Sequence, residues 1–271
     1  MTVLTGPDLI QYPGDMTTRY GLFNAAVTPS EWQPHWGDGG IVFEDEFCVL
    51  PRGYDVACTD ALAAKTFDPQ TSIPGTPFVV YAGLVCGSVG HTEAEFQAKA
   101  VNRLKAGEQG AVEAIFSRGL NGQSRPLANA VPNATLIVPS GTSVADQIGA
   151  LEEALYSTYG LRGVLHVPFQ YGERMHAAMA LVKDGSVWRT ALGTAVSIGN
   201  YEGYTPAGVA PAAGHTTIYI TGQTFVWRNP DIFVSDLAGS LNRATNQVTM
   251  LAEREYIVTY ECGAWAVDVT Y

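Results

Sequence analysis

The stretch from residue 77 to residue 118 most constrains what this chain can fold into. It opens with residues 77–86 (PFVVYAGLVC), an almost continuous apolar run of strand length. Such a run is typical of a strand that is buried on both faces. A turn rich in glycine and serine follows, built on Gly87, Ser88 and Gly90. The sequence therefore predicts a buried strand that turns directly into a second element.

That second element is a long helix. Thr92 stands three residues before Glu95, the capping-box spacing in which each side chain satisfies an N–H group at the helix start. We predict a helix from there to about Arg118, with a length of about 40 Å at 1.5 Å per residue. Its apolar residues fall near one stripe: Phe96, Ala100, Leu104, Ala111, Ile115 and Phe116. Gly107 and Gly110 interrupt it and predict a bend, a close backbone approach or merely a tolerated weak turn.

A second, amphipathic helix begins after Ser143, a good capping residue. Apolar residues recur along it at spacings of four, three and four: Val144, Ile148, Leu151 and Leu155. Gly160 is well placed to close it. A strand at 162–167 and a third helix from Pro168 to about residue 181 are predicted next. The order helix, strand, helix implies a layered α/β or α+β unit.

The remainder of the chain is strand-like, apart from a proline- and glycine-rich loop at 203–214. The predicted strands cover 187–198, 216–227, 231–235 and 247–271. In the last of these, the apolar residues change from even to odd positions around Gly263. This change of phase predicts a β-bulge at the glycine.

The first 76 residues are predicted to form extensions rather than a core. Residues 1–40 are broken by prolines and glycines but carry several aromatics, so we expect an arm that lies along another surface, its own or a neighbour's. Residues 41–76 are predicted to be an extended two-stranded excursion with a loose tip at 52–66.

Composition limits the partners of this protein. Charged residues make up 15% of the chain, against roughly 25% in an ordinary soluble domain. Two interpretations remain open: a compact core with a neutral surface, or extensive contact between subunits. The formal net charge of -11 argues against direct recognition of DNA, which relies on clustered basic groups.

The cysteines and the apolar runs indicate a soluble protein. Cys48, Cys58, Cys86 and Cys262 form no CxxC or CxC pair and are too sparse for a disulfide framework. We therefore expect buried or isolated thiols in a reducing compartment. No segment reaches the ~18 apolar residues needed to span a bilayer, so we expect no membrane association and no signal peptide.

No catalytic or metal-binding constellation is evident. The histidines are scattered and form no HExxH or HxH motif: His35, His91, His166, His176 and His215. His166 and His176 could meet in space, although such residues are more often satisfied core or boundary histidines. There is no Gly-x-Ser-x-Gly elbow, and Cys86 has only His91 as a nearby basic group. We predict no catalytic, cofactor-binding or metal-binding residues, and no cofactor.

Two further patterns are suggestive of enzymes but weak. Gly83, Gly87 and Gly90 lie between a strand and a capped helix, where amides can hold phosphate, but the spacing is not GxGxxG and no Walker lysine follows. Adjacent carboxylates occur at residues 44–46 and 152–153: Glu44, Asp45, Glu46, Glu152 and Glu153. We expect these to be solvated edges and faces.

In the order of its elements the chain resembles the Hong Kong 97 type of phage capsid fold. The phrases VCGSVGHTEAEFQAKA (residues 85–100) and LEEALYSTYGLRGVLHVP (residues 151–168) are similar to those of actinobacterial tailed-phage capsid subunits. The resemblance implies an α+β fold with an N-terminal arm (1–40), an extended loop (41–76), a peripheral domain with a spine helix (77–133 and 241–271) and an axial domain (134–240).

The function implied by the resemblance is that of a major capsid protein. Such a protein assembles with itself into pentamers and hexamers of an icosahedral phage head around double-stranded DNA, which is confined non-specifically. Separate scaffolding, portal and decoration proteins are implied as possible partners, and the site of action is the virion, assembled in the host cytoplasm. Some relatives crosslink a loop lysine to a neighbour, and Lys65 lies in the loop, although an ordinary surface lysine is the commoner case. The alternatives are an encapsulin-like shell, a minor virion component such as a tail or decoration protein, or a nucleotide-binding enzyme.

Overall fold

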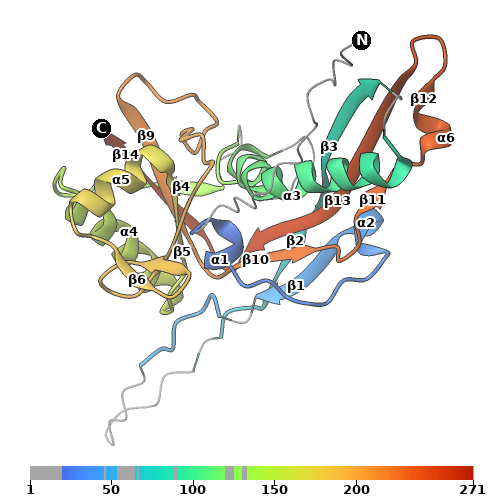
Figure 1. Cartoon of the computed structure of the whole chain (residues 1–271). Helices are drawn as coiled ribbons and strands as arrows, with labels where there is room; N and C mark the ends of the chain where they lie inside the picture. The colour runs from blue at the N-terminus through green and yellow to red at the C-terminus, as the bar shows by residue number, and fades with distance from the viewer. Residues whose placement is uncertain are drawn as a thin grey trace, which may run out of the picture.

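Two β-sheets, each with its own hydrophobic core, organise the chain (Figure 1). The structure is a computed structural model that describes residues 20–45, 47–53, 65, 67–87, 91–119, 125–129 and 133–270. The fold mixes helices and strands, as the sequence predicts for an α+β protein.

The five-stranded sheet is built around one long strand, β13. Its members are β3 (Pro77–Gly87), β10 (Thr224–Arg228), β11 (Phe233–Val234), β12 (Leu241–Asn242) and β13 (Gln247–Tyr260). All four partners pair antiparallel with β13. Helix α3 (Glu93–Arg118) packs against β3 and β13, and α6 (Leu237–Ser240) lies beside β13.

The seven-stranded sheet has the order β4-β14-β9-β5-β8-β7-β6. Its members are β4 (Ala134–Leu136), β5 (Val164–Pro168), β6 (Val182–Asp184), β7 (Val187–Arg189), β8 (Ala195–Gly199), β9 (His215–Thr221) and β14 (Ala264–Thr270). The β14–β4 and β5–β8 pairs are parallel, and the others are antiparallel. Helices α4 (Val144–Tyr159) and α5 (Phe169–Ala177) pack on this sheet.

The capping box predicted for the long helix is confirmed. The Thr92 side chain accepts a hydrogen bond from the Glu95 backbone N–H, and the Glu95 carboxylate accepts one from the Thr92 N–H. The helix runs to Arg118, and its apolar stripe is buried against the sheet. At Gly110 the side chain of Asn200 donates to the carbonyl oxygen at 3.1 Å, whereas Gly107 faces open space.

The strand predicted at 77–86 is present as β3, but the prediction that both its faces are buried is wrong. Burial alternates along β3, with Phe78, Val80 and Leu84 in the core. The alternate side chains of Val79, Tyr81 and Val85 are exposed. The reason is that α3 covers only one face of this sheet, and side chains on a strand point alternately to opposite faces.

The second and third helices form as expected, with one difference in length. Ser143 makes a capping box with Asp146, and Gly160 closes α4 with a φ of 68° in the left-handed region, which favours glycine. Pro168 stands at the start of α5. That helix ends at Ala177 rather than near residue 181.

The prediction of a β-bulge at Gly263 is wrong. Strand β13 ends at Tyr260 and β14 begins at Ala264, so the chain leaves one sheet and enters the other between these residues. The residue with positive φ is Cys262, at 59°. The change of phase in the apolar pattern therefore marks a transfer between sheets.

A second transfer lies beside the first. The predicted strand at 216–227 is divided into β9 and β10, which belong to different sheets, by residues 222–223. Thr224 pairs with Tyr260, and Thr221 pairs with Ala264. Residues 221–224 and 260–264 thus form a two-stranded connection between the sheets, here called the junction. Two backbone hydrogen bonds cross it, from Gly222 N to Gly263 O and from Glu261 N to Gln223 O.

The described part of the N-terminal arm packs on its own chain. It contains the short helices α1 (Leu22–Ala25) and α2 (Trp36–Gly39). Leu22 is fully buried, and Phe23 stacks on Tyr256 of β13. Residues 1–19 lie outside the described residues.

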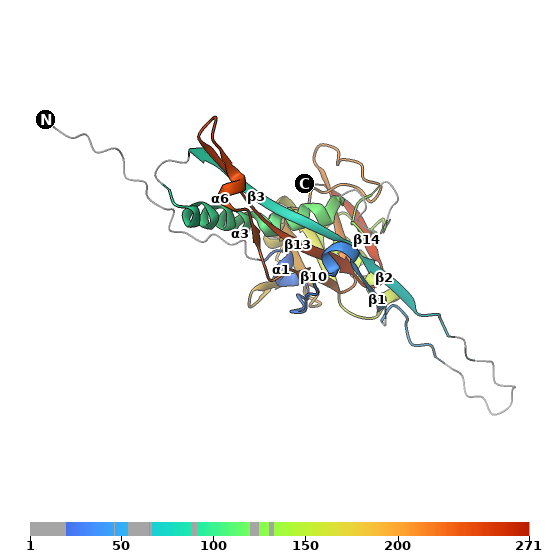
Figure 2. The same cartoon turned by 90° about the vertical axis from the view of Figure 1, so that its right-hand side faces the viewer.

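The two-stranded excursion is confirmed at its base. Strands β1 (Ile41–Asp45) and β2 (Thr71–Gly75) pair antiparallel. Beyond them run two segments, residues 47–53 and 67–70, here called the loop legs. Figure 2 shows that the legs leave the body along the line of β3. Most of the predicted tip, residues 54–64 and 66, lies outside the described residues.

Within the described ranges no helix is long and apolar enough to cross a membrane.

We predict that Gly163→Ala destabilises the subunit strongly. A Cβ at Gly163 would lie 1.8 Å from the carbonyl oxygen of Thr221 at the junction, and backbone there cannot move without disturbing both sheets. The expected loss is about 2 kcal/mol or more. Gly149→Ala is the matched control, because a Cβ at that exposed helical position meets nothing within 4 Å and should be neutral or stabilising by up to ~1 kcal/mol. Thermal unfolding of both variants decides the matter, and equal melting temperatures would refute the prediction.

Candidate functional site

The histidines have structural partners rather than a shared site. His166 is fully buried, and its ring nitrogens lie 3.1 Å from Tyr201 Oη and 3.0 Å from Thr221 Oγ1. Burial lowers the pKa of His166 to about 3, so the ring is neutral. His176 packs instead on Trp188. The two histidines therefore do not form the pair that the sequence left open.

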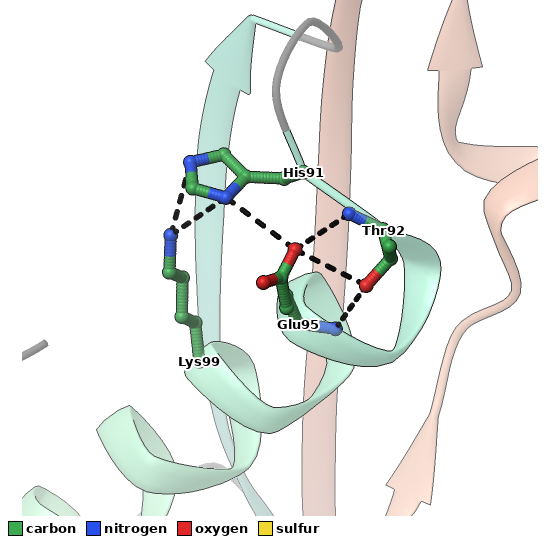
Figure 3. A network of polar contacts seen from close by, with 4 residues as sticks. All are labelled: His91, Thr92, Glu95 and Lys99. Carbon is green, nitrogen blue, oxygen red and sulfur yellow. Dashed lines mark hydrogen bonds and ion pairs between the residues drawn. The ribbon is translucent and has the colours of Figure 1, made fainter. Parts of the chain in front are cut away.

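His91 belongs to a small polar network at the start of α3 (Figure 3). The Lys99 ammonium lies 3.2 Å from His91 Nε2, and His91 Nδ1 lies 3.7 Å from the Glu95 carboxylate. The hydrogen bond from the Thr92 backbone lowers the pKa of Glu95. These contacts fix the first turns of the helix, which is a structural role. His35 lies against Trp36, and His215 Nδ1 lies 3.3 Å from an Asp268 oxygen.

Two of the adjacent carboxylates are not the solvated groups that were expected. Asp45 is buried and accepts the Cys262 backbone N–H at 3.2 Å. Glu152 is buried and accepts hydrogen bonds from the hydroxyls of Thr190 and Thr194, each at 2.6 Å. Both therefore tie separate segments together. Glu44 and Glu153 are exposed as predicted, and Glu46 lies outside the described residues.

The glycines before the long helix do not form an evident phosphate site. The Gly83 carbonyl accepts a hydrogen bond from Arg103 at 3.0 Å, and Gly87 is the last residue of β3. Gly90 lies outside the described residues. Cys86 is a half-buried free thiol. Among the residues that the structure describes, no group of three or more His, Cys, Asp or Glu side chains is placed to hold a metal ion.

The expectation of isolated thiols is wrong for Cys48 and Cys262. These residues form a disulfide across a sequence separation of 214, with Cα atoms 4.9 Å apart. It joins a loop leg to the junction. Sequence spacing could not reveal this pair, because only the tertiary fold brings the two cysteines together. Cys58 lies outside the described residues.

Helix α3 is fixed to the sheet by buried charge. Glu108 accepts hydrogen bonds from Arg254 at 2.8 Å and from the Tyr256 hydroxyl at 2.6 Å, and Arg228 lies 3.4 Å away. Sequence reasoning did not single out Glu108. A signal was present, because Glu108 stands four residues after Leu104 in the helix stripe that faces the core.

Glu113 is the second buried carboxylate of α3, and it holds three segments together. One oxygen accepts the Leu22 N–H of the arm at 2.9 Å, and the other accepts the Asn200 N–H after β8 at 2.7 Å. No cation is among its hydrogen-bond partners in the described structure. Burial raises the pKa of Glu113 to about 7, although both N–H bonds oppose the shift.

The candidate functional surface is the apolar surface of the loop legs and of the body beside them. Its members are exposed large apolar side chains: Val42, Phe47, Val49, Leu50, Phe67, Tyr156 and Leu161. Phe67 is 86% exposed. A hollow of about 550 Å³ lies beside the start of the first leg, between it, the end of α4 and β10, and is lined by Phe47, Tyr156, Leu161, Arg162 and Phe225, among others. Exposed apolar surface of this kind marks a contact with another molecule.

The legs are held to each other by polar contacts. Arg52 forms an ion pair with Asp68, in which the Nη2 group donates to both carboxylate oxygens at 2.8 and 2.6 Å. Gln70 donates to Glu44 at 3.1 Å. A second apolar surface consists of Val79, Tyr81 and Val85 on the uncovered face of β3, which we call the β3 stripe. The arrangement suits binding of protein surfaces.

Solved structures similar to this chain include capsids of GTA particles, structures from phages and a virus-like particle. The capsid of a native GTA particle computed with C5 symmetry has a TM-score of 0.61 at 12% identity, and the match covers 99% of this chain and 96% of that chain. A structure from Microbacterium phage Oxtober96 has a TM-score of 0.56 at 12% identity, with 98% and 96% covered. A virus-like particle from Pyrococcus furiosus has a TM-score of 0.51 at 10% identity, with 92% of each chain covered.

These likenesses show that the chain has the fold of phage capsid subunits, which confirms the predicted α+β class of the Hong Kong 97 type. No family model and no curated protein matches the sequence.

We predict that Glu113 makes subunit stability depend on pH. Its pKa is about 7 in the folded state against 4.5 for an ordinary glutamate, so the folded state binds the proton more tightly. The contribution to stability is therefore full below pH 4.5 and is lost as the pH rises through 7, by about 3 kcal/mol at most. Denaturant unfolding of dilute, unassembled subunit at pH 5 and pH 8 measures this difference.

Two variants make the assignment specific. Glu113→Gln should flatten the pH dependence, although its amide NH₂ must face one of the two N–H donors and should also lower stability at both pH values. Glu153→Gln, at an exposed position of α4, should leave the profile unchanged. An unaltered profile in Glu113→Gln would show that another group is responsible.

Proposed function

We propose that this chain is a major capsid protein that assembles with itself into the pentamers and hexamers of an icosahedral phage head. The observation that carries this proposal is the likeness in fold to capsid subunits over almost the whole length of both chains. Because the likeness extends over almost the whole chain, the fold supports the proposal that the subunit is a shell component. The C5 symmetry of the GTA capsids is in keeping with pentamers.

The surfaces support self-association. The loop legs project from the body (Figure 1), and their apolar side chains have little of their own chain to cover them. A lone soluble subunit would expose these groups to water at a cost in free energy, which burial against a neighbour removes. Because a symmetric shell repeats each contact at every subunit, even a modest surface of this kind stabilises the whole.

We propose the domain division implied by the resemblance, with one qualification from the strand pairing. The arm would be residues 1–40, the extended loop 41–76, the peripheral domain 77–133 and 241–271, and the axial domain 134–240. Strand β14 pairs in the seven-stranded sheet, and β10 pairs in the five-stranded sheet. The strands therefore cross the proposed boundary at the junction.

We further propose that the shell encloses double-stranded DNA without recognising its sequence and that the subunit catalyses no reaction. The net charge of -11 supports a shell that confines DNA without binding it tightly, because acidic groups repel the phosphates of the DNA. The virion would be its site of action, with assembly in the host cytoplasm. Scaffolding, portal and decoration proteins would be separate chains.

An encapsulin-like compartment is the second candidate, because the Pyrococcus furiosus virus-like particle shares the fold. Its TM-score and coverage are lower than those of the GTA capsid, so the phage head is the better supported proposal. The contents of particles isolated from their natural source separate the two. Nuclease-protected double-stranded DNA supports the phage head, and enclosed protein without DNA supports the compartment.

We predict that the expressed protein forms closed, hollow particles of uniform size. Electron microscopy and sedimentation of the purified chain measure this directly. Co-expression with candidate scaffolding chains is the companion experiment. A monodisperse monomer at all concentrations and under both conditions would contradict the proposal, and would favour a minor virion component.

We predict that the tip of the loop is needed for assembly but not for folding. Replacing residues 54–64 by a short Gly/Ser linker keeps the Arg52–Asp68 ion pair, and the change in loop-closure entropy is small. The subunit should therefore melt within ~2 °C of wild type but fail to close into shells. A matched linker in the exposed loop segment 207–213 is the control for loop replacement as such. Normal shells from the tip variant, or its unfolding, would refute the loop assignment.

A further inference from the structure

The disulfide joins the most projecting part of the molecule to the place where its two sheets meet. Cys48 lies on the first loop leg, and Cys262 lies in the junction. The junction side is firmly held: the Cys262 N–H donates to Asp45, and its carbonyl accepts from Arg125 at 2.7 Å. Buried Glu261, the preceding residue, bonds to the Tyr159 hydroxyl of α4. One end of the bridge is thus anchored in the body.

The leg end is held much less firmly without the bridge. Phe47, Val49 and Leu50 are 50%, 47% and 37% exposed. Leu50 contacts the end of α4, since a Cβ at Gly160 would lie 2.6 Å from its Cδ2 atom. The Arg52–Asp68 pair joins one leg to the other rather than to the body. The disulfide is therefore the strongest of these attachments between the first leg and the body.

The position of the two cysteines implies that the bridge forms late in folding. With a sequence separation of 214, they meet only after β1 and the junction have both formed. Each residue is half-buried rather than fully buried, so we expect small thiols and disulfides to have access to the pair. A cytoplasm keeps accessible cysteine pairs reduced, and an extracellular medium does not.

We propose that Cys48 and Cys262 form a redox-controlled fastener of the extended loop. As two thiols they leave the first leg free to adjust while subunits fit together; as a disulfide they fix the leg to the junction in the finished shell. The timing rests on the proposed function, because it assumes assembly in a reducing cytoplasm and later release. The fastening itself is a property of the folded subunit.

The reaction is a thiol–disulfide exchange with a small-molecule disulfide as the oxidant. The thiolate of one cysteine attacks a sulfur of that disulfide, which releases one small thiol and forms a mixed disulfide. The second cysteine, as thiolate, attacks the protein sulfur and displaces the second small thiol. The two cysteines lose two electrons and two protons in total, and the small-molecule disulfide gains both as two thiols. A dithiol reverses the exchange.

The experiment uses the full chain with Cys58→Ser and Cys86→Ser, which leaves only the pair in question. The control adds Cys48→Ser to this background. Both proteins are treated with oxidised glutathione or with dithiothreitol, and the bridge is measured by intact mass after alkylation and by peptide mapping. The accessibility of residues 47–53 is followed by hydrogen exchange in the unassembled subunit, and particle melting is followed after assembly.

We expect the reduced pair to assemble and the bridge to form afterwards within the particles. Oxidation should slow hydrogen exchange of the leg at least ~10-fold and raise the particle melting temperature by about 5 °C or more. In the control, oxidised glutathione can form only a mixed disulfide with Cys262, and neither reagent should change the hydrogen exchange of the leg or the particle melting temperature. No bridge under oxidising conditions, or a bridge with unchanged exchange and melting, would overturn the fastener.

Assembly is scored separately, so that the two proposals can fail independently. If particles form only after oxidation, the proposed timing is wrong. If no particles form in either state, the shell proposal fails, while slower exchange of the bridged leg in the lone subunit still supports the fastener.

Discussion

The paired strands at the junction are the constraint on which the rest of the structure depends. Strands β9 and β10 on one side, and β14 and β13 on the other, stay paired through the point where the chain passes between sheets. The Gly222 N–H donates to the Gly263 carbonyl, and there is no room for a side chain at Gly222, since a Cβ there would lie 2.4 Å from the Glu261 carbonyl oxygen. The two cores are therefore held in a fixed relation by main-chain hydrogen bonds rather than by a flexible linker.

Buried polar groups then orient the helices and the arm on this frame. Glu108 and Glu113 lie on one helix but are neutralised differently. Among the described residues, Glu108 has Arg254 as a counter-ion, whereas Glu113 accepts hydrogen bonds from two backbone N–H groups. Removing one partner of either arrangement would leave a buried polar group unsatisfied, which costs more than the bond itself contributes. Such contacts fix position more strictly than apolar packing does, because each one needs a particular partner in a favourable geometry.

The sequence predicted those elements whose causes are local. Residues that are neighbours in the sequence determine the Thr92 and Ser143 capping boxes and the end of α4 at Gly160. The antiparallel excursion follows from a local pattern of apolar and polar residues bounded by turn residues. The failures have tertiary causes. Strand β3 was expected to be buried on both faces, because an apolar run does not reveal that α3 covers only one. The phase change near Gly263 was visible, yet a transfer between sheets and a bulge give the same pattern. The partners of Asp45, Glu152 and Cys262 lie far away in the chain, so no spacing could identify them.

The contrast between the body and the loop legs has a physical reason. Among the described residues, the buried carboxylates and Arg254 each have a hydrogen-bond partner within the chain. On the legs and on the β3 stripe, the reverse holds: apolar side chains such as Phe67 of the second leg and Tyr81 of β3 are exposed at 86% and 71%, although β1 is paired with β2 and β3 with β13. A subunit can stay soluble in this state only if the apolar groups are spread along a thin projection and do not form one broad patch. A projection of that kind cannot bury its apolar groups against itself. Such groups are buried only when another surface packs against the projection. They therefore contribute little to the free energy of folding and contribute instead to the free energy of association.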